Sequence, residues 1–284
     1  ISQTLRNQRP DEIPHLFAYS QLLLSINGHE GRYGTCNTPA KFWAAWREED
    51  ISDAEMYALK NKKLTVSQKQ SLFSYRPVDD LTWYENLISG GDLAVTGQDQ
   101  LLISLLKPER LLEMVRLYTL FDKKAGKIVA RYQQIFGIKR LIERISTKNS
   151  KGGREGGVIW HTTGSGKSFT MVFLSKALIL REALKQCRIL VVTDRVDLED
   201  QLSKTFVSGG ELTGKRDKQN AMATSGKRLA EQIGKGTERI MFSLIQKFNS
   251  ATKLPECVNT SSDFIVLIDE GHRSQGGENH VRMK

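Results

Sequence analysis

Apolar runs alternate with amphipathic stretches in the second half of the chain, and this alternation predicts the fold class. Four apolar runs are candidate strands: 157–160, 188–193, one within 239–248, and 263–269. Apolar residues at helical spacing predict helices over 168–184 and 197–206, between these strands. Continuously apolar strands separated by helices are typical of a parallel sheet covered on both faces. We therefore predict an α/β domain with a mostly parallel sheet.

The first part of the chain has a less regular pattern and predicts a separate α/β or α+β domain without an obvious site. Residues 16–28 contain a strand that ends in an Asn27-Gly28 turn. A helix is expected from Thr38, with Pro39 in its first turn. A second expected helix, 107–121, is amphipathic. Its apolar face carries Leu111, Met114, Val115 and Tyr118.

Two connecting segments divide the chain. The first domain passes into the second near 121–127, so we assign residues 1–120 and 121–284 to separate domains. Residues 146–157 are polar, basic and rich in glycine. Such a composition predicts a flexible loop, which leads directly into the first strand of the second domain.

A phosphate-binding loop is predicted at Gly164–Ser168, between the strand at 157–160 and the helix that follows. Glycines let the backbone N–H groups of such a turn approach an anion closely, and the next helix directs its N-terminus at the same point. Lys167 would reach the β- and γ-phosphates of ATP, and the Ser168 hydroxyl would ligate Mg²⁺. His161 stands where the G-x-x-x-x-G-K-[ST] pattern begins with glycine. That outer position shapes the loop more than it grips phosphate, so we expect the site to work. The predicted cofactor-binding residues of the loop are Thr163, Gly164, Ser165, Gly166, Lys167, Ser168 and Phe169.

An acidic pair follows the last apolar run and completes the predicted site. Asp269 and Glu270 stand at the carboxyl end of that strand, where α/β sheets bind ligands. Asp269 would hold the Mg²⁺ shared with Ser168, and Glu270 would orient and deprotonate the attacking water. An Asp-Glu pair alone also caps helices. After a phosphate loop, however, the pair predicts a nucleotide hydrolase whose catalytic residues are Lys167, Asp269 and Glu270.

Asp269-Glu270-Gly271-His272 resembles the Asp-Glu-x-His motif of superfamily-two helicases and translocases, although alanine or cysteine is commoner at the position of Gly271. The segments around the motifs resemble the R subunit of type I restriction enzymes more closely. They are VIWHTTGSGKSFTM (158–171), VVTDRVDLEDQL (191–202), SLIQKF (243–248) and LIDEGHRSQGG (267–277). Upstream, 127–145 and the stretch from Ile13 to Trp46 also resemble this family.

The resemblance implies a RecA-like lobe over 121–284 that uses ATP and Mg²⁺ to drive translocation along double-stranded DNA. It implies that Gln134 reads the adenine edge, with Arg131 nearby, although 127–145 is equally an ordinary amphipathic helix. His272 would couple the nucleotide state to the DNA-binding surface. The implied contacts to the DNA backbone are Arg195, Ser243, Gln246 and Lys247. The implied partners are the modification and specificity subunits of the restriction complex.

Several parts of such an enzyme are not recognisable in this sequence. Residues 1–120 resemble the end of a nuclease-type α/β domain, but we find no convincing Asp…Glu-x-Lys set, and Asn7 replaces the tyrosine of a later Gln-x-x-x-Tyr pattern. The arginine finger of a second motor lobe is also missing. The chain begins at Ile1 rather than Met. We therefore expect a fragment that binds ATP, hydrolyses it poorly and does not cut DNA alone.

Composition agrees with a nucleic-acid partner. Lys and Arg number 42 against 32 Asp and Glu, a net charge of +10, which favours a polyanion. The cysteines Cys36, Cys187 and Cys257 have no paired spacing, so neither a disulfide framework nor a zinc site is expected. With no apolar run of membrane-spanning length, we expect a cytoplasmic protein. Two alternatives stay open: another superfamily-two motor, and an ATP-binding assembly module without catalysis.

Overall fold

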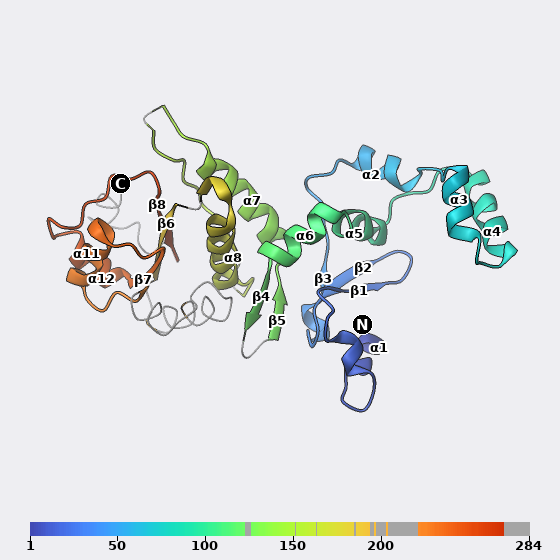
Figure 1. Ribbon diagram of the computed structural model, residues 1–284, viewed down its shortest axis with the longest axis horizontal. Coiled ribbons are helices and arrows are strands. Elements are labelled where there is room, and N and C mark those ends of the chain that lie inside the picture. The colour runs from blue at the N-terminus through green and yellow to red at the C-terminus, as the bar shows by residue number, and fades with distance from the viewer. Residues whose placement is uncertain are drawn as a thin grey trace. The chain divides into compact units, whose positions relative to one another are not determined.

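The computed structural model places two compact units along the chain, Ile1–Glu113 and Met114–Lys284. It describes residues 1–122, 126–150, 152–162, 164–184, 186–193, 196, 203 and 221–269. Their helices and strands are labelled in Figure 1. The units divide within α6 (Pro108–Leu117), slightly before the predicted division at 120–121.

The first unit contains a three-stranded antiparallel sheet in the order β1-β2-β3. Its strands are β1 (Leu23–Ile26), β2 (Gly31–Gly34) and β3 (Ala44–Ala45). The predicted turn after β1 is confirmed. The Asn27 side-chain oxygen accepts hydrogen bonds from the backbone N–H groups of His29 and Glu30 at 3.1 and 2.7 Å. Gly28 has a φ of +94°, a conformation that glycine adopts without strain.

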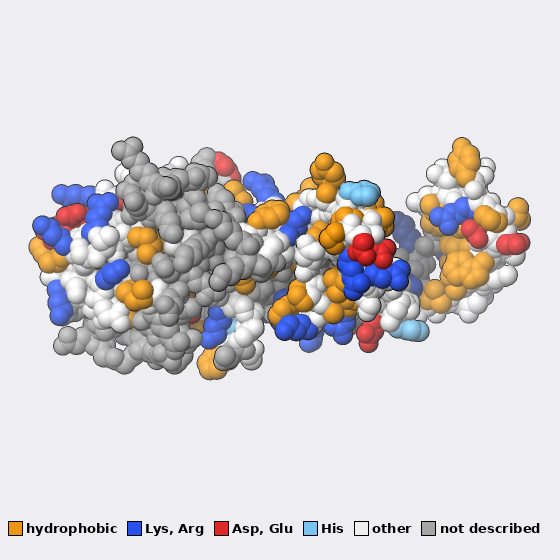
Figure 2. All heavy atoms as spheres, turned by 90° about the horizontal axis from the view of Figure 1, so that it is seen from below, with side chains coloured by type: hydrophobic (Ala, Val, Ile, Leu, Met, Phe, Trp, Pro, Cys, Tyr) orange, Lys and Arg blue, Asp and Glu red, His pale blue; other side chains and the backbone are white. Residues whose placement is uncertain are grey.

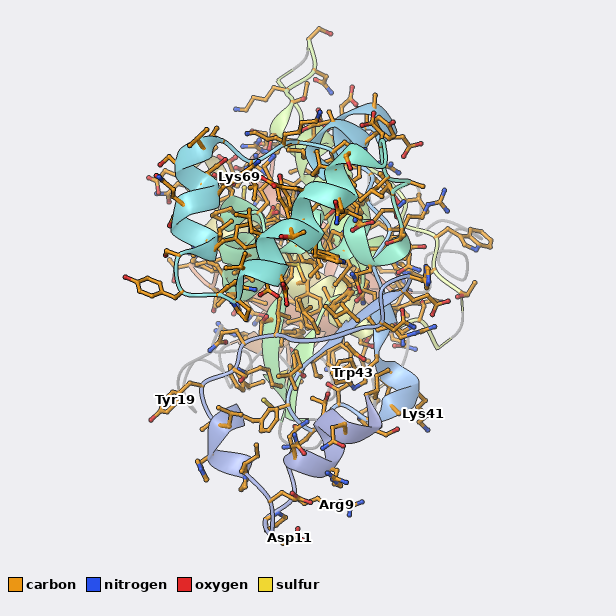
Figure 3. The ribbon with its side chains drawn as sticks, turned by 90° about the vertical axis from the view of Figure 1, so that its right-hand side faces the viewer. Arg9, Asp11, Tyr19, Lys41, Trp43 and Lys69 are labelled. Carbon is orange, nitrogen blue, oxygen red and sulfur yellow. The ribbon has the colours of Figure 1, made fainter. Side chains whose placement is uncertain are left out.

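The helix predicted from Thr38 is wrong. The chain forms only the short 3₁₀ helix η2 (Ala40–Phe42) and then extends into β3, which pairs with β2. Trp43 and Trp46 are 3% and 4% exposed, so this arrangement buries both indoles. Their spacing of three residues fits a helix face equally well, which is why the pattern misled the prediction. By contrast, Tyr19 is 91% exposed and extends outward in Figure 3.

A buried charged cluster stabilises the first unit beneath Trp46. The Arg110 guanidinium contacts Asp50 at 2.8 Å and Glu48 at 3.5 Å, and it lies 5.4 Å from the Trp46 ring centroid. Burial alone would raise the pKa of Glu48. Hydrogen bonds from the Asp50 N–H and the Trp46 indole, together with the Arg110 charge, outweigh it and hold the pKa below its ordinary value. The cluster thus pairs the buried charges with one another.

The remaining helices of the first unit are short. They are α1 (Ser2–Asn7), η1 (Pro14–Phe17), α2 (Asp53–Lys60), α3 (Val66–Phe73), α4 (Val78–Ser89) and α5 (Gly97–Leu105). Helices α3 and α4 contain no buried residue. Apolar side chains are visible on the surface at the right of Figure 2, where these two helices lie. Val66, Val78 and Trp83 are 75%, 79% and 65% exposed.

The second unit begins with an antiparallel hairpin and two packed helices. The hairpin strands are β4 (Thr119–Asp122) and β5 (Gly126–Val129). They lead into α7 (Tyr132–Ser146), and α8 (Lys167–Leu180) packs beside it, followed by η3 (Glu182–Leu184). The Lys176 ammonium of α8 donates to the carbonyl of Thr119 at 3.1 Å, which joins hairpin and helix.

The second unit also contains a parallel three-stranded sheet in the order β7-β6-β8. Its strands are β6 (Arg188–Thr193), β7 (Ile240–Leu244) and β8 (Phe264–Ile268). In the parallel register, Val192 of β6 lies opposite Ser243 on one side and Ile268 on the other. Three of the predicted strands and their parallel pairing are thereby confirmed.

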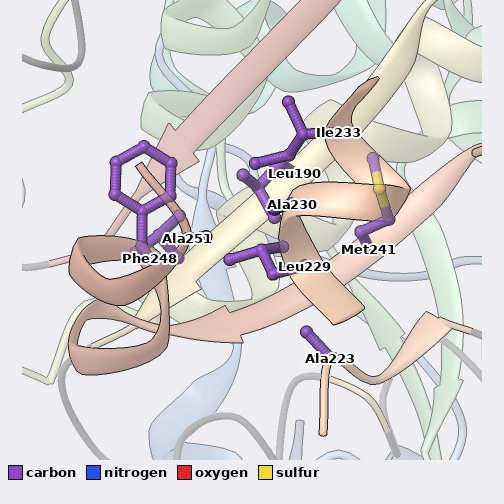
Figure 4. Packing of buried hydrophobic residues seen from close by; sticks show 9 residues of the cluster. Leu190, Ala223, Leu229, Ala230, Ile233, Met241, Phe248 and Ala251 are labelled. Carbon is purple, nitrogen blue, oxygen red and sulfur yellow. The ribbon is translucent and has the colours of Figure 1, made fainter. Parts of the chain in front are cut away.

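An apolar core forms between this sheet and two helices, α11 (Gly226–Lys235) and α12 (Ile245–Ala251). Figure 4 shows its buried members, which are Leu190, Val192, Ala223, Leu229, Ala230, Ile233, Met241, Phe248 and Ala251. Helix α11 starts close against α12, since a Cβ on Gly226 would lie 2.7 Å from that of Ser250. Removal of this apolar surface from water holds the sheet and helices together.

The strand predicted at 157–160 is wrong. Residues 155–162 have no regular secondary structure, and no described strand pairs with them. Val158 and Trp160 are 86% and 90% exposed, so the apolar run is not buried as a parallel strand would be. The helix predicted at 197–206 lies almost entirely outside the described residues. Among the helices that are described, none has the length and apolarity to cross a bilayer.

Candidate nucleotide-binding site

Asp269 lies at the carboxyl edge of the parallel sheet. It follows β8 directly, and its backbone N–H donates to the carbonyl of Val192 in β6 at 2.9 Å. The neighbouring strands β6 and β7 end at the same edge, at Thr193 and Leu244. This is the position that the sequence predicts for a carboxylate that holds a metal ion beside a nucleotide.

The phosphate loop ends in a turn that only glycine adopts readily. Gly164 and Gly166 have φ angles of +78° and +88°, and α8 begins immediately afterwards at Lys167. Inside the turn, the Ser165 hydroxyl donates to the carbonyl of Thr162 at 2.6 Å. The first turn of α8 leaves backbone N–H groups without partners inside the helix, and its dipole favours an anion there. These residues therefore fit a bound phosphate.

Gln134 fastens the phosphate loop to the start of α7. This side chain is 5% exposed, and its amide nitrogen donates to the carbonyl of Gly166 at 3.1 Å and to the hydroxyl of Thr170 at 2.9 Å. Its oxygen accepts the backbone N–H of Arg131 at 2.9 Å. Both N–H groups of the amide are thus engaged. The adenine-reading role stays a prediction, and it requires the amide to give up one of these bonds.

Replacing Gln134 with methionine is expected to lower the free energy of unfolding by about 1–3 kcal/mol, because buried groups lose their partners. Denaturant unfolding measures this change, and Gln133→Met is the matched control, since Gln133 is exposed in the same turn. A role in positioning the loop lowers affinity for ATP and GTP by the same factor. A loss confined to ATP would instead support adenine reading, and an unchanged stability would contradict the anchoring.

The surroundings of His161 disfavour the charged form of its imidazole. Partial burial, and then the positive charge of Lys167, lower the pKa of this side chain below its ordinary value of 6.5. Its Nε2 atom is buried and has no hydrogen-bond partner among the residues that the structure describes. In the sequence, this histidine departs from the glycine of the common pattern, although it fits the resemblance to R subunits.

Several predicted site residues lie outside the described residues. They are Thr163, Arg195, Glu270 and His272. Lys167 and Ser168 start α8, whereas Asp269 ends β8, so the elements that carry them are in place. Their convergence on a single magnesium–triphosphate stays a prediction, as does the contribution of Phe169, which lies in the first turn of α8.

The predicted DNA contact of Ser243 needs correction. Its side chain is fully buried in β7, and its hydroxyl donates to the carbonyl of Leu244 at 3.0 Å. The position is next to the end of a strand that is buried along its length, so the hydroxyl faces the interior. Gln246 is exposed and Lys247 is partly exposed in the first turn of α12, where contact with a phosphate backbone stays a prediction.

Arg154 has a structural role that the sequence did not reveal. Its guanidinium donates to the carbonyls of Ser262 and Ile145 at 2.9 and 3.0 Å and forms an ion pair with Asp263 at 2.6 Å. One side chain therefore joins the end of α7, the segment before the phosphate loop and the start of β8. A single arginine in a glycine-rich stretch carries no pattern that would have indicated this.

Comparison with known proteins identifies the family. A model of the family described as SWI2/SNF2 ATPase matches residues 133–284, more than half of the chain, including the phosphate loop and Asp269. The chain belongs to the SWI2/SNF2 ATPase family. Membership explains why the glycine turn, the following helix and the acidic strand end occur together in the second unit.

Similar curated proteins extend the match into the first unit. The type I restriction enzyme HindI endonuclease subunit of Haemophilus influenzae is 32% identical over 94% of this chain. The type I restriction enzyme SauCOLORF180P endonuclease subunit of Staphylococcus aureus is 28% identical over 64% of the chain. The resemblance to R subunits is thereby confirmed. This chain spans only 23% and 18% of the length of these two relatives.

Proposed function

We propose that residues 121–284 form the first RecA-like motor lobe of a type I restriction enzyme R subunit. The lobe would bind ATP and Mg²⁺, and the whole protein would couple hydrolysis to translocation along double-stranded DNA before cleavage. One observation carries the proposal. In a SWI2/SNF2 ATPase, Lys167 begins a helix after the left-handed glycines Gly164 and Gly166, and Asp269 ends a strand of a parallel sheet.

The residues divide the work of phosphoryl transfer. Backbone N–H groups of the loop would cradle the phosphates, and the Lys167 ammonium would neutralise charge on the β- and γ-phosphates. Ser168 and Asp269 would hold Mg²⁺, which supplies further neutralisation when it is bound. Glu270 would accept the proton of the attacking water. Little covalent chemistry is required of the protein, so rigid placement of these groups accounts for most of the rate.

Double-stranded DNA and the other subunits of a restriction complex are the proposed partners. The net charge of +10 suits a polyanion. Arg195 and Lys247 would neutralise backbone phosphates, Gln246 would donate a hydrogen bond, and His272 would link the nucleotide to this surface. Residues 1–120 would form the C-terminal part of a nuclease-type domain. The proposed partner subunits are the modification and specificity subunits. The relatives' names, type I restriction enzyme endonuclease subunits, support this assignment over other superfamily-two motors.

Stimulation of ATP hydrolysis by DNA tests the proposal. We expect slow hydrolysis by the 284-residue chain, because the arginine finger belongs to a second lobe. The protein extended through that lobe is expected to hydrolyse ATP faster when double-stranded DNA is added. Equal rates with and without DNA in the extended protein would contradict the motor. If DNA left the rate of hydrolysis unchanged but the protein still bound nucleotide, a non-catalytic assembly module would be the better description.

A further inference from the structure

His161 carries an unused hydrogen-bonding group at the start of the phosphate loop. Its Nε2 atom is buried and has no partner among the described residues. Buried polar atoms in native proteins almost always have a partner, because water no longer solvates them. An imidazole kept in this state at a predicted ligand site therefore indicates a partner that arrives with the ligand.

The surroundings of His161 select an anionic partner. Partial burial, and then the positive charge of Lys167, lower the pKa of the imidazole and so disfavour its charged form. A neutral imidazole with its proton on Nε2 donates one hydrogen bond through that atom. Phosphate oxygens only accept at neutral pH, and Lys167 attracts them to the same place. A phosphate would accept the hydrogen bond of the imidazole and attract the Lys167 ammonium, whereas a cation would be repelled by Lys167.

The terminal phosphate is the one left for side chains to bind. In a loop of this type, the backbone N–H groups surround the inner phosphates, and the lysine reaches outward to the β- and γ-phosphates. Gly164 and Gly166 have the left-handed φ angles that a tight glycine turn of this kind uses. His161 lies within the electrostatic reach of Lys167. The outermost phosphate is thus the acceptor that matches the position of Lys167.

We propose that His161 donates a hydrogen bond from Nε2 to the γ-phosphate of bound ATP and so makes the site prefer nucleoside triphosphates over diphosphates. This inference rests on the proposed function, since it requires a nucleotide in the loop. It gives a direct binding role to the one loop position that departs from the common pattern.

Equilibrium binding of two nucleotides tests the role of His161. Calorimetric titration of the 284-residue chain with Mg²⁺ and either ADP or the non-hydrolysable β,γ-imido analogue of ATP gives both affinities. In His161→Ala, affinity for the analogue is expected to fall roughly ten- to a hundredfold, the loss of one hydrogen bond to a charged group, while affinity for ADP changes less than about threefold. His161→Gln places an amide N–H near the same point and is expected to restore most of the lost affinity.

The outcomes separate this inference from the proposed function. Thermal unfolding of both variants first establishes that they fold. Selective loss in His161→Ala and recovery in His161→Gln support the phosphate contact. If the unsubstituted chain binds nucleotide, any other pattern of affinities in the two variants overturns the phosphate contact. Equal losses of affinity for ADP and for the ATP analogue are one such pattern. If the unsubstituted chain binds neither nucleotide, the nucleotide site and this inference fail together.

Discussion

Replacing Lys167 with alanine is expected to abolish the thermal stabilisation that ATP gives to the chain. A ligand present at about 100 times its Kd stabilises the folded state by about 2.7 kcal/mol, which corresponds to a rise in Tm of roughly 5–10 °C for a unit of this size. Without the ammonium group, the charge of the β- and γ-phosphates has lost its principal neutralising partner. The measurement is Tm with and without Mg²⁺ and ATP, in the variant and the unsubstituted chain.

Lys253→Ala is the matched control for this substitution. Lys253 is exposed just beyond α12, so the same change of side chain removes the same charge elsewhere. It is expected to keep the full rise in Tm with ATP. A rise of equal size in Lys167→Ala would refute the assignment of the phosphate loop, whatever the absolute stability of the variant.

Glu270→Gln in the full-length protein is expected to retain ATP binding and to lose turnover. The amide keeps the size of the side chain but does not accept the proton of the attacking water. Loss of a positioned general base lowers rates by roughly 10²–10⁴-fold. The kcat for ATP hydrolysis in the presence of DNA measures the effect, and the Kd of the non-hydrolysable analogue shows that binding persists.

Glu256→Gln provides the comparison, because Glu256 is an exposed carboxylate in the turn after α12. Its kcat is expected to equal that of the unsubstituted protein. Turnover by Glu270→Gln at the same rate would contradict the base, and would direct attention to Asp269 or to a residue of the second lobe. Loss of nucleotide binding in Glu270→Gln would equally contradict a purely catalytic role.

The strands β6, β7 and β8 were predictable because each is a continuous apolar run. The sheet buries most of β6 and β7, whereas β8 at its edge is mainly half-buried. Where a run is short or its period ambiguous, the prediction failed. Residues 157–160 contain too few apolar side chains to require burial, and Val158 and Trp160 stay exposed. Between Thr38 and Glu48, helix and strand explain the tryptophan spacing equally well, and only the pairing with β2 decides between them.

Motif spacing predicted the helix that begins at Lys167 and the strand that ends before Asp269, but not the contacts between the elements of the candidate site. The glycine turn and Asp269 are where the sequence placed them. The bonds of Gln134 to the loop depend on how α7 packs against α8, which no local pattern encodes. Ser243 is buried because both faces of β7 are covered, so neither face would have exposed its side chain. Tertiary packing decides both, so they had to be observed.

The three-way contact of Arg154 constrains how the second unit is able to change shape. Because one guanidinium bonds to the end of α7 and to the residues before β8, separating these two elements would break its contacts. We expect any widening or narrowing around a nucleotide to change the irregular backbone at 155–162, between Arg154 and the phosphate loop. That stretch is free of ladder hydrogen bonds, so its dihedral angles change without breaking the sheet. Opening and closing of the nucleotide site would then change the backbone of residues 155–162, while the strands of the parallel sheet keep their pairing.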